Sequence, residues 1–234
     1  LFSDVPENVI HKWSAEKGIE EFLRPSGYTG TVTYSEEPGS NGLIINKKGN
    51  LVSCEHGDRR IAEMPLNRPD KKKTLAHLFE GKKLNSPNDL VQKSSGDYFF
   101  TDPPYGLPGR GKDEPAKEIA FQGVYRIDTK GKLTLQAKDL ARPNGLAFSP
   151  DEKILYVGQS DMKGLIWMAY PVNPDGNLNG PLMHDGSIKT LLDVINHYDA
   201  IPNNTANTNL DNRLRPRGTP QILNLTNDEK EAVA

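Results

Sequence analysis

The sequence predicts an all-β fold: a partial, unclosed β-propeller of about three to four blades, followed by a small helical C-terminal tail. Three observations support this prediction. A unit of two short apolar strands occurs three times within the first 178 of the 234 residues. The 21 glycines and 18 prolines favour many short strands joined by turns over long helices. Beyond residue 178 the repeat stops and a helical pattern takes its place.

The repeated unit contains an asparagine, a short apolar strand, a polar turn and a second apolar strand. The three units run from Asn41 to Glu55, from Asn88 to Asp102 and from Asn144 to Gln159. From 41 to 88 and from 88 to 144, the intervals are 47 and 56 residues. A repeat of roughly this length is typical of propeller blades, each with about four strands. We therefore expect Asn41, Asn88 and Asn144 at equivalent innermost positions of consecutive blades.

Two further segments predict hairpins that complete the blades. Residues 8–23 contain two apolar stretches around a turn at Lys17-Gly18, and residues 123–135 do the same around Lys130-Gly131. Between the second and third units, residues 103–122 are rich in glycine and proline near their start. This pattern indicates a long loop, and long loops on a rigid sheet often frame a site.

The beginning of the chain resembles the end of a strand. The chain starts at Leu1 rather than Met, and Asp4 occupies the place in its unit that Asp102 occupies in another. Its blade should therefore begin about ten residues before Leu1. We interpret the chain as a fragment whose first blade is cut in half, and residues 1–4 show no signal-peptide pattern.

Composition excludes several classes of function. With 29 basic and 31 acidic residues and no basic stripe, the chain is not expected to bind nucleic acid. No apolar run approaches the roughly 18 residues of a membrane span. Cys54 is the single cysteine, which rules out an internal disulfide and covalent haem attachment. We expect Cys54 in an inert core strand and Arg59-Arg60 at a solvated strand end.

Several motifs resemble the bacterial gluconolactonases, which belong to the senescence marker protein, gluconolactonase and luciferin-regenerating enzyme family. They include Asn-Ser-Pro-Asn-Asp-Leu and Arg-Pro-Asn-Gly-Leu-Ala-Phe-Ser-Pro-Asp, and they recur in order at the family's spacing. The resemblance covers residues 1 to about 178. The matching segments are 1–6, 54–60, 85–90, 98–106 and 142–151.

The resemblance implies a six-bladed propeller that hydrolyses a sugar lactone, such as gluconolactone, with one divalent ion, usually calcium, at its axis. The family's ligands are a Glu from the first blade, two Asn from middle blades and an Asp from a later blade. Asn88 and Asn144 match the two Asn. The Glu would lie before Leu1, and Asp175 belongs to a blade turn of the family rather than to the ligand motif. No catalytic residue is therefore assigned.

The chemistry of these residue types agrees with that role. Calcium takes about six to eight oxygen ligands, and amide oxygens provide them without adding charge. The ion can polarise a lactone carbonyl as a Lewis acid, while a carboxylate takes a proton from water. Another divalent cation could take the place of calcium. With both family carboxylates missing, we expect weak metal binding and impaired lactone hydrolysis.

Four residues are candidates for substrate binding, and each has a structural alternative. Asn41 could line the pocket or form a turn. His56 could touch the substrate or serve the structure. Asp102 and Tyr105 are expected near the rim, although Asp102 could instead bond a neighbouring backbone group. Asp89 is assigned to the turn rather than to catalysis, and a turn role is also the alternative for Asn88 and Asn144.

The segment 179–234 predicts a different, helical unit. Ile188, Leu191, Leu192, Ile195 and Tyr198 would share one helix face, with Ser187 as the cap. The segment resembles the C-terminal end of bacterial di-haem cytochrome c peroxidases through residues 183–187, 190–191, 197–198 and 209–214. No haem is expected, because the attachment motif is absent. The hybrid favours a misassembled or frameshifted reading frame over an evolved fusion.

Two rival functions remain open at this point. One is a non-catalytic propeller that binds a ligand or a protein, and the other is part of a haem peroxidase gene product. The expected partner is a small-molecule sugar lactone, with self-association through open sheet edges as a second expectation. The compartment stays open between the periplasm and the cytoplasm of a bacterium.

Overall fold

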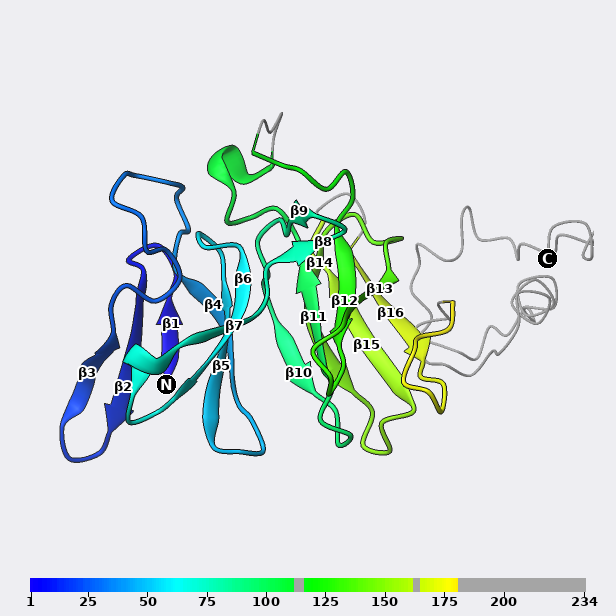
Figure 1. The fold of residues 1–234 in the computed structure, drawn as a ribbon, viewed down its shortest axis with the longest axis horizontal. Helices are drawn as coiled ribbons and strands as arrows, with labels where there is room; N and C mark the ends of the chain where they lie inside the picture. Colours follow the sequence, from blue (N-terminus) through cyan, green and yellow to red (C-terminus); the bar gives the residue numbers. More distant parts are fainter. Residues whose placement is uncertain (112–115, 162–164, 181–234) are drawn as a thin grey trace, which may run out of the picture.

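The structure, a computed structural model, describes residues 1–111, 116–161 and 165–180. Four antiparallel sheets follow one another across Figure 1, from β1–β3 in blue to β14–β16 in green and yellow. We call these sheets the first to fourth blades. The all-β, unclosed propeller predicted from the sequence is confirmed. The helix expected at 187–198 and the tail from residue 181 onward lie outside the described residues.

Each blade runs through its strands in sequence order. The first blade contains β1 (Phe2–Asp4), β2 (Val9–Ser14) and β3 (Gly18–Leu23). The second contains β4 (Ser40–Ile45), β5 (Asn50–Glu55), β6 (Arg60–Pro65) and β7 (Lys73–Ala76). The third contains β10 (Leu90–Gln92), β11 (Tyr98–Asp102), β12 (Gly123–Ile127) and β13 (Leu133–Ala137). The fourth contains β14 (Pro143–Phe148), β15 (Ile154–Gln159) and β16 (Ile166–Pro171).

Short elements fill the connections between the long strands. The hairpin of β8 (Leu78–Phe79) and β9 (Lys82–Lys83) follows the second blade, and the 3₁₀ turns are η1 (Pro69–Lys71) and η2 (Pro108–Gly111). The loop expected between the second and third units contains η2. Within the described ranges, no helix is long and apolar enough to cross a membrane.

The three repeat asparagines lie at the innermost strands of successive blades, as predicted. Asn41 is in β4, Asn144 is in β14, and Asn88 comes two residues before β10. Strand β10 contacts both β4 and β14, so the inner strands of the three blades are neighbours. Strand β1 pairs with β2 in the way that β11 pairs with β12.

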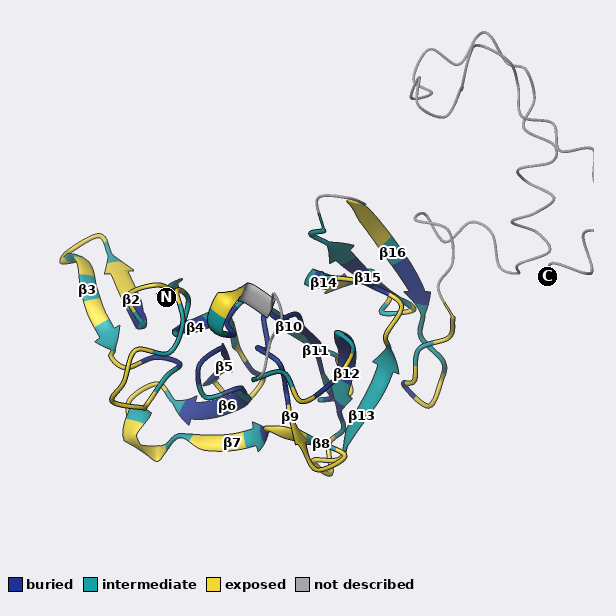
Figure 2. Ribbon diagram, turned by 90° about the horizontal axis from the view of Figure 1, so that it is seen from above, coloured by how far each residue is buried: buried dark blue, intermediate teal, exposed yellow. Residues whose placement is uncertain are grey.

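The hydrophobic core lies between the blades, where Figure 2 shows buried strands. One cluster joins the second and third blades through Val52, Ile61, Phe100 and Tyr125. The third and fourth blades meet at Phe99, Val124, Leu155 and Val157. The first and second meet at Ile10, Leu51 and Met64. Each middle blade therefore buries apolar side chains on both faces, as stacked sheets must.

The turn between the two strands of each repeated unit needs a residue in the left-handed backbone region. Gly49 (φ +78°) and Gly96 (φ +103°) provide it without strain in the second and third blades. In the fourth blade the residue is Glu152 (φ +56°), for which this conformation is unfavourable. The Glu152 carboxylate accepts hydrogen bonds from the Ser94 backbone N–H (2.7 Å) and the Lys93 ammonium (3.0 Å). These contacts with the third blade offset the backbone strain.

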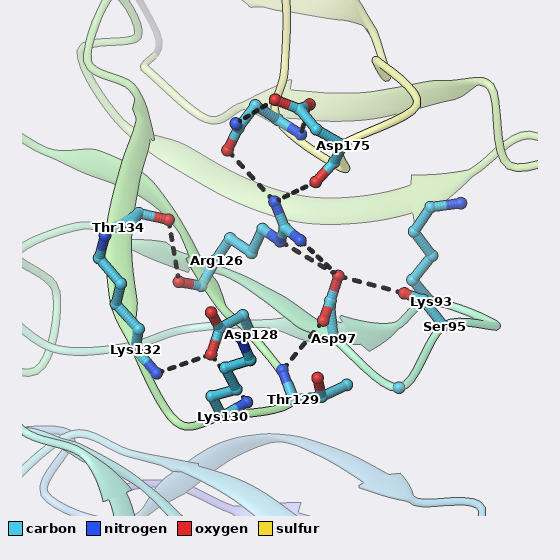
Figure 3. A network of polar contacts seen from close by, with 12 residues as sticks. Lys93, Ser95, Asp97, Arg126, Asp128, Thr129, Lys130, Lys132, Thr134 and Asp175 are labelled. Atoms are coloured by element: carbon cyan, nitrogen blue, oxygen red, sulfur yellow. Dashed lines mark hydrogen bonds and ion pairs between the residues drawn. The ribbon is translucent and has the colours of Figure 1, made fainter.

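An arginine in β12 connects the third blade to the segment after β16. Figure 3 shows the Arg126 guanidinium donating to Asp97 Oδ2 through Nη2 (2.8 Å) and Nε (3.1 Å). Its Nη1 donates to the backbone oxygen of Asp175 (2.9 Å). A Cβ at Gly176 would lie 2.7 Å from Arg126 Cζ, so the backbone packs directly on the guanidinium. Asp175 thus belongs to a turn that packs on Arg126.

The prediction that Arg59-Arg60 forms a solvated strand end was wrong for Arg59. This side chain is only 7% exposed, and its guanidinium donates to the backbone oxygens of Leu84 and Ala116. These carbonyl oxygens, together with an ion pair of 3.6 Å between Arg59 Nη1 and Glu118 Oε1, satisfy the buried charge. Arg60 Nε forms an ion pair of 2.6 Å with Glu55 Oε2, which is fully buried.

Candidate functional site

Asn88 and Asn144 both form hydrogen bonds with Thr101 through their backbone groups. The Asn88 backbone N–H donates to the Thr101 carbonyl oxygen (2.9 Å), and the Thr101 hydroxyl donates to the Asn144 carbonyl oxygen (2.7 Å). On the other side, the Gly42 backbone N–H donates to the Asn88 carbonyl oxygen (2.7 Å). A continuous set of hydrogen bonds therefore connects the asparagine positions of the second, third and fourth blades.

The residue after Asn41 must be small for these strands to meet. A Cβ at Gly42 would lie 2.8 Å from the Asn88 carbonyl oxygen and from Asp89 Cα. Both neighbours are backbone atoms, so a larger residue would push β4 away from β10. The glycine of this Asn-Gly pair therefore serves strand packing and not only a turn.

The side-chain amides of Asn88 and Asn144 are weakly engaged. Asn88 is only 5% exposed, yet no hydrogen bond within the described part of the chain involves its amide. The Asn144 amide N–H makes one contact, a long 3.4 Å hydrogen bond to Ser160 Oγ. Neither amide oxygen accepts a hydrogen bond within the described ranges, so both can bind a ligand.

Asp89 is the residue that the sequence interpretation undervalued. Its Oδ1 accepts from the Leu90 N–H (2.9 Å) and its Oδ2 from the Leu146 N–H (3.3 Å), so the carboxylate joins β10 to β14. Burial raises the pKa of Asp89, although these N–H bonds oppose the shift. The other two units have a glycine at this position, Gly42 and Gly145. A carboxylate in place of glycine was the sequence feature that could have indicated a special role for Asp89.

A pocket of about 540 Å³ opens on the fourth blade beside this cluster. Asp89 and Asn144 form its polar side, and Tyr156 and Trp167 form an aromatic side. A site that combines a few polar groups with apolar walls suits a small organic ligand.

Tyr105 joins the same cluster through a residue that the sequence did not indicate. The hydroxyls of Tyr105 and Ser160 lie 2.6 Å apart, and Ser160 Oγ also accepts from the Asn144 amide. The Arg142 guanidinium stands over the Tyr105 ring, 5.4 Å from its centroid. Ser160 immediately follows the third unit, where the repeat assigns no polar role. The candidate Tyr105 is therefore connected to the candidate ligand Asn144.

His56 and Asn41 form a second pair. His56 Nε2 lies 3.4 Å from Asn41 Nδ2, and its Nδ1 lies 3.1 Å from the Glu37 carbonyl oxygen. A carbonyl oxygen only accepts, so Nδ1 carries the proton and Nε2 accepts from the Asn41 amide. Burial lowers the pKa of His56 to about 4. His56 is therefore a neutral hydrogen-bond acceptor at pH 7.

Asp102 lies in the interior of the third blade, fully buried. Its Oδ2 accepts from the Asn85 backbone N–H (2.7 Å), and its Oδ1 has no partner among the described residues. Burial raises the pKa of Asp102 to about 7, against the opposing effect of Arg59. The geometry gives Asp102 the backbone-bonding role named as its alternative, and substrate contact stays a prediction.

Cys54 lies in the core between the second and third blades. It is completely buried, as expected, and burial raises the pKa of its thiol, with Asp89 and Asp102 adding to the shift. A thiol held neutral in this way is a poor nucleophile and a poor metal ligand.

The described residues bring few oxygen donors together at this cluster. No three His, Cys, Asp or Glu side chains of the described ranges gather in a way that could hold a metal ion. The donors in the cluster are the amide oxygens of Asn88 and Asn144 and the carboxylate of Asp89. Calcium favours such oxygens, but about six to eight of them. The ligand roles of Asn88 and Asn144 remain a prediction.

Comparison with known proteins adds independent findings. A family model described as the SMP-30/Gluconolactonase/LRE-like region matches residues 1–187. The gluconolactonase of Zymomonas mobilis is 39% identical over 179 residues, which are 75% of this chain and 49% of the relative. A lactonohydrolase of Aspergillus oryzae is 34% identical over 88 residues, which are 37% of this chain and 20% of the relative.

Solved structures agree with these relatives. The structure of a gluconolactonase from Xanthomonas campestris is 33% identical, with a TM-score of 0.64, over 77% of this chain and 56% of that one. A luciferin-regenerating enzyme, with 16% identity and a TM-score of 0.53, shares the fold over 77% of this chain and 54% of that one. The chain thus spans about half the length of the relatives it matches. The motifs at Asn88 and Asn144, the blade architecture and the family match agree: the chain belongs to the SMP-30/gluconolactonase/LRE-like family.

Proposed function

We propose that the cluster around Asn88 and Asn144 is a site for hydrolysis of a sugar lactone, such as gluconolactone, and that its activity in this chain is impaired. The observation that carries the proposal is a pair of hydrogen bonds at Thr101, which accepts from the Asn88 N–H and donates to the Asn144 carbonyl oxygen and so holds the asparagines of adjacent blades together. The family membership and the resemblance to gluconolactonases support the reaction class.

Asn88 and Asn144 would hold a divalent cation, with calcium the first choice, through their amide oxygens. Such an ion supplies Lewis-acid polarisation of a carbonyl group. The chain's own residues act around it by binding and orienting the substrate. Asp89 fixes the relative position of β10 and β14 by accepting N–H groups from both sides of the cluster.

The remaining polar groups suit the hydroxyl-rich ring of a sugar lactone. Ser160 and Tyr105 place two hydroxyl groups beside Asn144, and each can donate or accept. The Asn41 amide, held by neutral His56, presents its free oxygen as an acceptor. These groups carry no net charge, which matches an uncharged substrate.

The charge of the cluster is the reason for impaired activity. Two neutral amides and one carboxylate provide little negative charge to offset the desolvation of a divalent ion. Asp89 is the carboxylate of the cluster, and it already accepts hydrogen bonds from two backbone N–H groups. A second carboxylate, which could take a proton from water, is not among the described residues of the cluster. Loss of a general base commonly costs about 10²–10⁴ in rate.

The test is gluconolactone hydrolysis by the 234-residue chain, followed as proton release and corrected for spontaneous opening, with calcium or with a chelator. We expect a calcium-dependent rate at least about 10²-fold below that of the Zymomonas mobilis relative. Asn88→Ala and Asn144→Ala should abolish this rate, while Asn67→Ala, an exposed control, should not. A rate equal to that of the relative would contradict impairment. A calcium-dependent rate that both variants retain would contradict the site.

A non-catalytic binding role is the second candidate, and the absence of a three-residue acidic or histidine cluster among the described residues favours it. In that case a non-hydrolysable sugar lactam should bind and be weakened by Tyr105→Phe, while no lactone turnover above the spontaneous rate is seen. The peroxidase alternative concerns residues outside the described ranges and stays a prediction.

A further inference from the structure

The imidazole of His56 is fixed in place by the backbones of two loops. Its Nδ1 lies 3.1 Å from the Glu37 carbonyl oxygen, and the His56 backbone N–H donates to the Gly39 carbonyl oxygen (3.2 Å). From the other loop, the Gly106 backbone packs against the ring, since a Cβ at Gly106 would lie 2.4 Å from His56 Cγ. His56 is fully buried, so its ring cannot turn without displacing one of these loops.

The loop that carries Gly106 is anchored to the segment before Asn88. The Gly106 N–H donates to Ser86 Oγ (2.9 Å), and the Ser86 hydroxyl donates to the Pro103 carbonyl oxygen (2.6 Å). Ser86 is fully buried and precedes Asn88 by two residues. The position of the His56 ring is therefore connected to the inner segment of the third blade.

This fixed imidazole determines which end of the Asn41 carboxamide faces it. Because Nδ1 donates its proton to the Glu37 carbonyl oxygen, Nε2 is an acceptor, and the Asn41 amide presents its NH₂ group to Nε2 at 3.4 Å. The opposite orientation would bring the amide oxygen against the lone pair of Nε2. The Asn41 amide oxygen therefore points away from His56, and it accepts no hydrogen bond within the described part of the chain.

Asn41 lies beside Asn88 at the inner strands. Strand β4 contacts β10, and a backbone hydrogen bond of 2.7 Å joins the residue after Asn41 to the Asn88 carbonyl oxygen. The Asn41 amide oxygen can only accept a hydrogen bond. By contrast, the Ser160 and Tyr105 hydroxyls beside Asn144 can each donate or accept. The second-blade side of the site therefore requires a ligand group that donates, whereas the fourth-blade side does not.

We propose that His56 is a positioning residue for Asn41, and that the Asn41 amide oxygen makes the site prefer lactones with a hydroxyl on the carbon next to the carbonyl. This inference rests on the proposed function, in which the lactone carbonyl is bound at Asn88 and Asn144. The substituent next to that carbonyl is the one that Asn41, on the neighbouring inner strand, can reach. A lactone with a CH₂ group at this carbon leaves the amide oxygen unpaired, which is unfavourable. The preferred class is thus the 2-hydroxy lactones, which include the aldonolactones.

The first measurement is the affinity of the 234-residue chain for D-gluconolactam and for its 2-deoxy analogue, by calorimetry with calcium present. A lactam resists hydrolysis, so it reports recognition separately from catalysis. The wild type should bind the 2-hydroxy compound about tenfold more tightly, because the analogue leaves a polar group without its partner. His56→Leu and Asn41→Leu should each abolish this preference. His56→Gln should keep most of it, since an amide oxygen can accept from Asn41 in place of Nε2. His77→Leu, at an exposed histidine, should leave the preference unchanged.

The second measurement follows the imidazole itself, by NMR of the histidine ring nitrogens without calcium or ligand. The wild type should carry a proton on Nδ1 and stay neutral down to about pH 4, because burial lowers the pKa of His56 to about 4. Asn41→Asp places a carboxylate against Nε2 and should raise this pKa, since a nearby opposite charge favours the protonated ring. The signals of His56 are identified by their loss in His56→Gln, and those of His77 should not change.

Several results would overturn the proposal. Equal affinity of the wild type for the two lactams, or binding of neither, would contradict the preference for a 2-hydroxyl group. A preference that survives in His56→Leu, or a His56 pKa that does not change in Asn41→Asp, would show that His56 does not orient Asn41. A preference without any lactone turnover would contradict the proposed catalysis and leave this inference standing. Circular dichroism shows which variants fold, and Asn41→Leu and Asn41→Asp keep the test decisive if His56→Leu does not.

Discussion

The hydroxyl of Thr101 in β11 donates a 2.7 Å hydrogen bond to the backbone carbonyl oxygen of Asn144 in β14. Ser3 makes the same contact two blades earlier, because its hydroxyl donates to the Asn41 carbonyl oxygen over 2.7 Å. A hydroxyl of one blade thus fixes the asparagine of the next. At the corresponding position of the second blade stands Cys54, and there the Gly42 N–H bonds the Asn88 carbonyl oxygen instead.

Replacement of Thr101 by valine should destabilise the chain and loosen Asn144. The methyl group keeps the packing of this fully buried residue, but the Asn144 carbonyl oxygen loses its donor. Loss of a buried hydrogen bond typically costs about 1–3 kcal/mol. Urea unfolding of Thr101→Val measures this cost. Thr33→Val, at an exposed residue, is the control, and equal midpoints for the two variants would contradict the assignment.

The buried carboxyl of Asp102 should make stability fall as pH rises between about 4 and 7. Its folded-state pKa of about 7 lies above the ordinary value of 3.8, so the folded chain holds this proton more tightly than the unfolded chain. The stabilisation is complete below the unfolded pKa and is lost as pH rises through the folded pKa. The full effect is at most about 4 kcal/mol, because each tenfold difference in proton affinity between the two states contributes about 1.36 kcal/mol.

The test compares the thermal midpoint of Asp102→Asn with that of the wild type from pH 4 to pH 8. As pH rises, the thermal midpoint of Asp102→Asn should increase relative to that of the wild type. His56 has the opposite effect, since its pKa of about 4 lies below its usual 6.5 and its contribution is lost as pH falls. Because His56 is present in both proteins, its effect cancels in the difference. A difference that does not change with pH would refute the assignment.

Removal of the Arg126 guanidinium should lower the stability of the fold strongly, because it leaves the buried Asp97 carboxylate without its ion-pair partner. The Asp97 side chain is 6% exposed and its ion pair with Arg126 is 2.8 Å long. Breaking a buried pair from one side typically costs about 3–5 kcal/mol. Arg126→Met should therefore lower the urea midpoint strongly, and adding Asp97→Asn should recover part of the loss. Lys17→Met, which breaks the exposed pair with Glu20, should have little effect. If Arg126→Met and Lys17→Met lowered the urea midpoint equally, the buried ion pair would contribute no more to stability than the exposed one.

The sequence was sufficient for the repeated parts of the fold. The spacing of Asn41, Asn88 and Asn144 predicted three adjacent inner strands, because each unit carries its own turn and apolar pattern. The pairing of β2 with β3 and of β12 with β13 was also predicted, since both hairpins have a lysine-glycine turn.

Features created by contacts between distant segments were not predictable in the same way. Arg59 is buried because carbonyl oxygens of Leu84 and Ala116 meet its guanidinium, 25 and 57 residues away in sequence. Asp89 resembles a turn residue until Leu146, 57 residues later, donates to its carboxylate. Ser160 carries no pattern of its own and gains its role from Tyr105. Local sequence shows which groups are polar, but not which distant groups will satisfy them.

Calcium titration by calorimetry tests the central claim, that Asn88 and Asn144 form a partial cation site, most directly. We predict a wild-type Kd of about 1 mM or weaker, because the donors are few and mostly neutral. Asn144→Asp adds one carboxylate at the proposed position and should tighten binding at least about tenfold, or about 1.4 kcal/mol. The exposed control Asn67→Asp should change nothing. A micromolar wild-type Kd, or an Asn144→Asp variant that binds no better than Asn67→Asp, would contradict the claim.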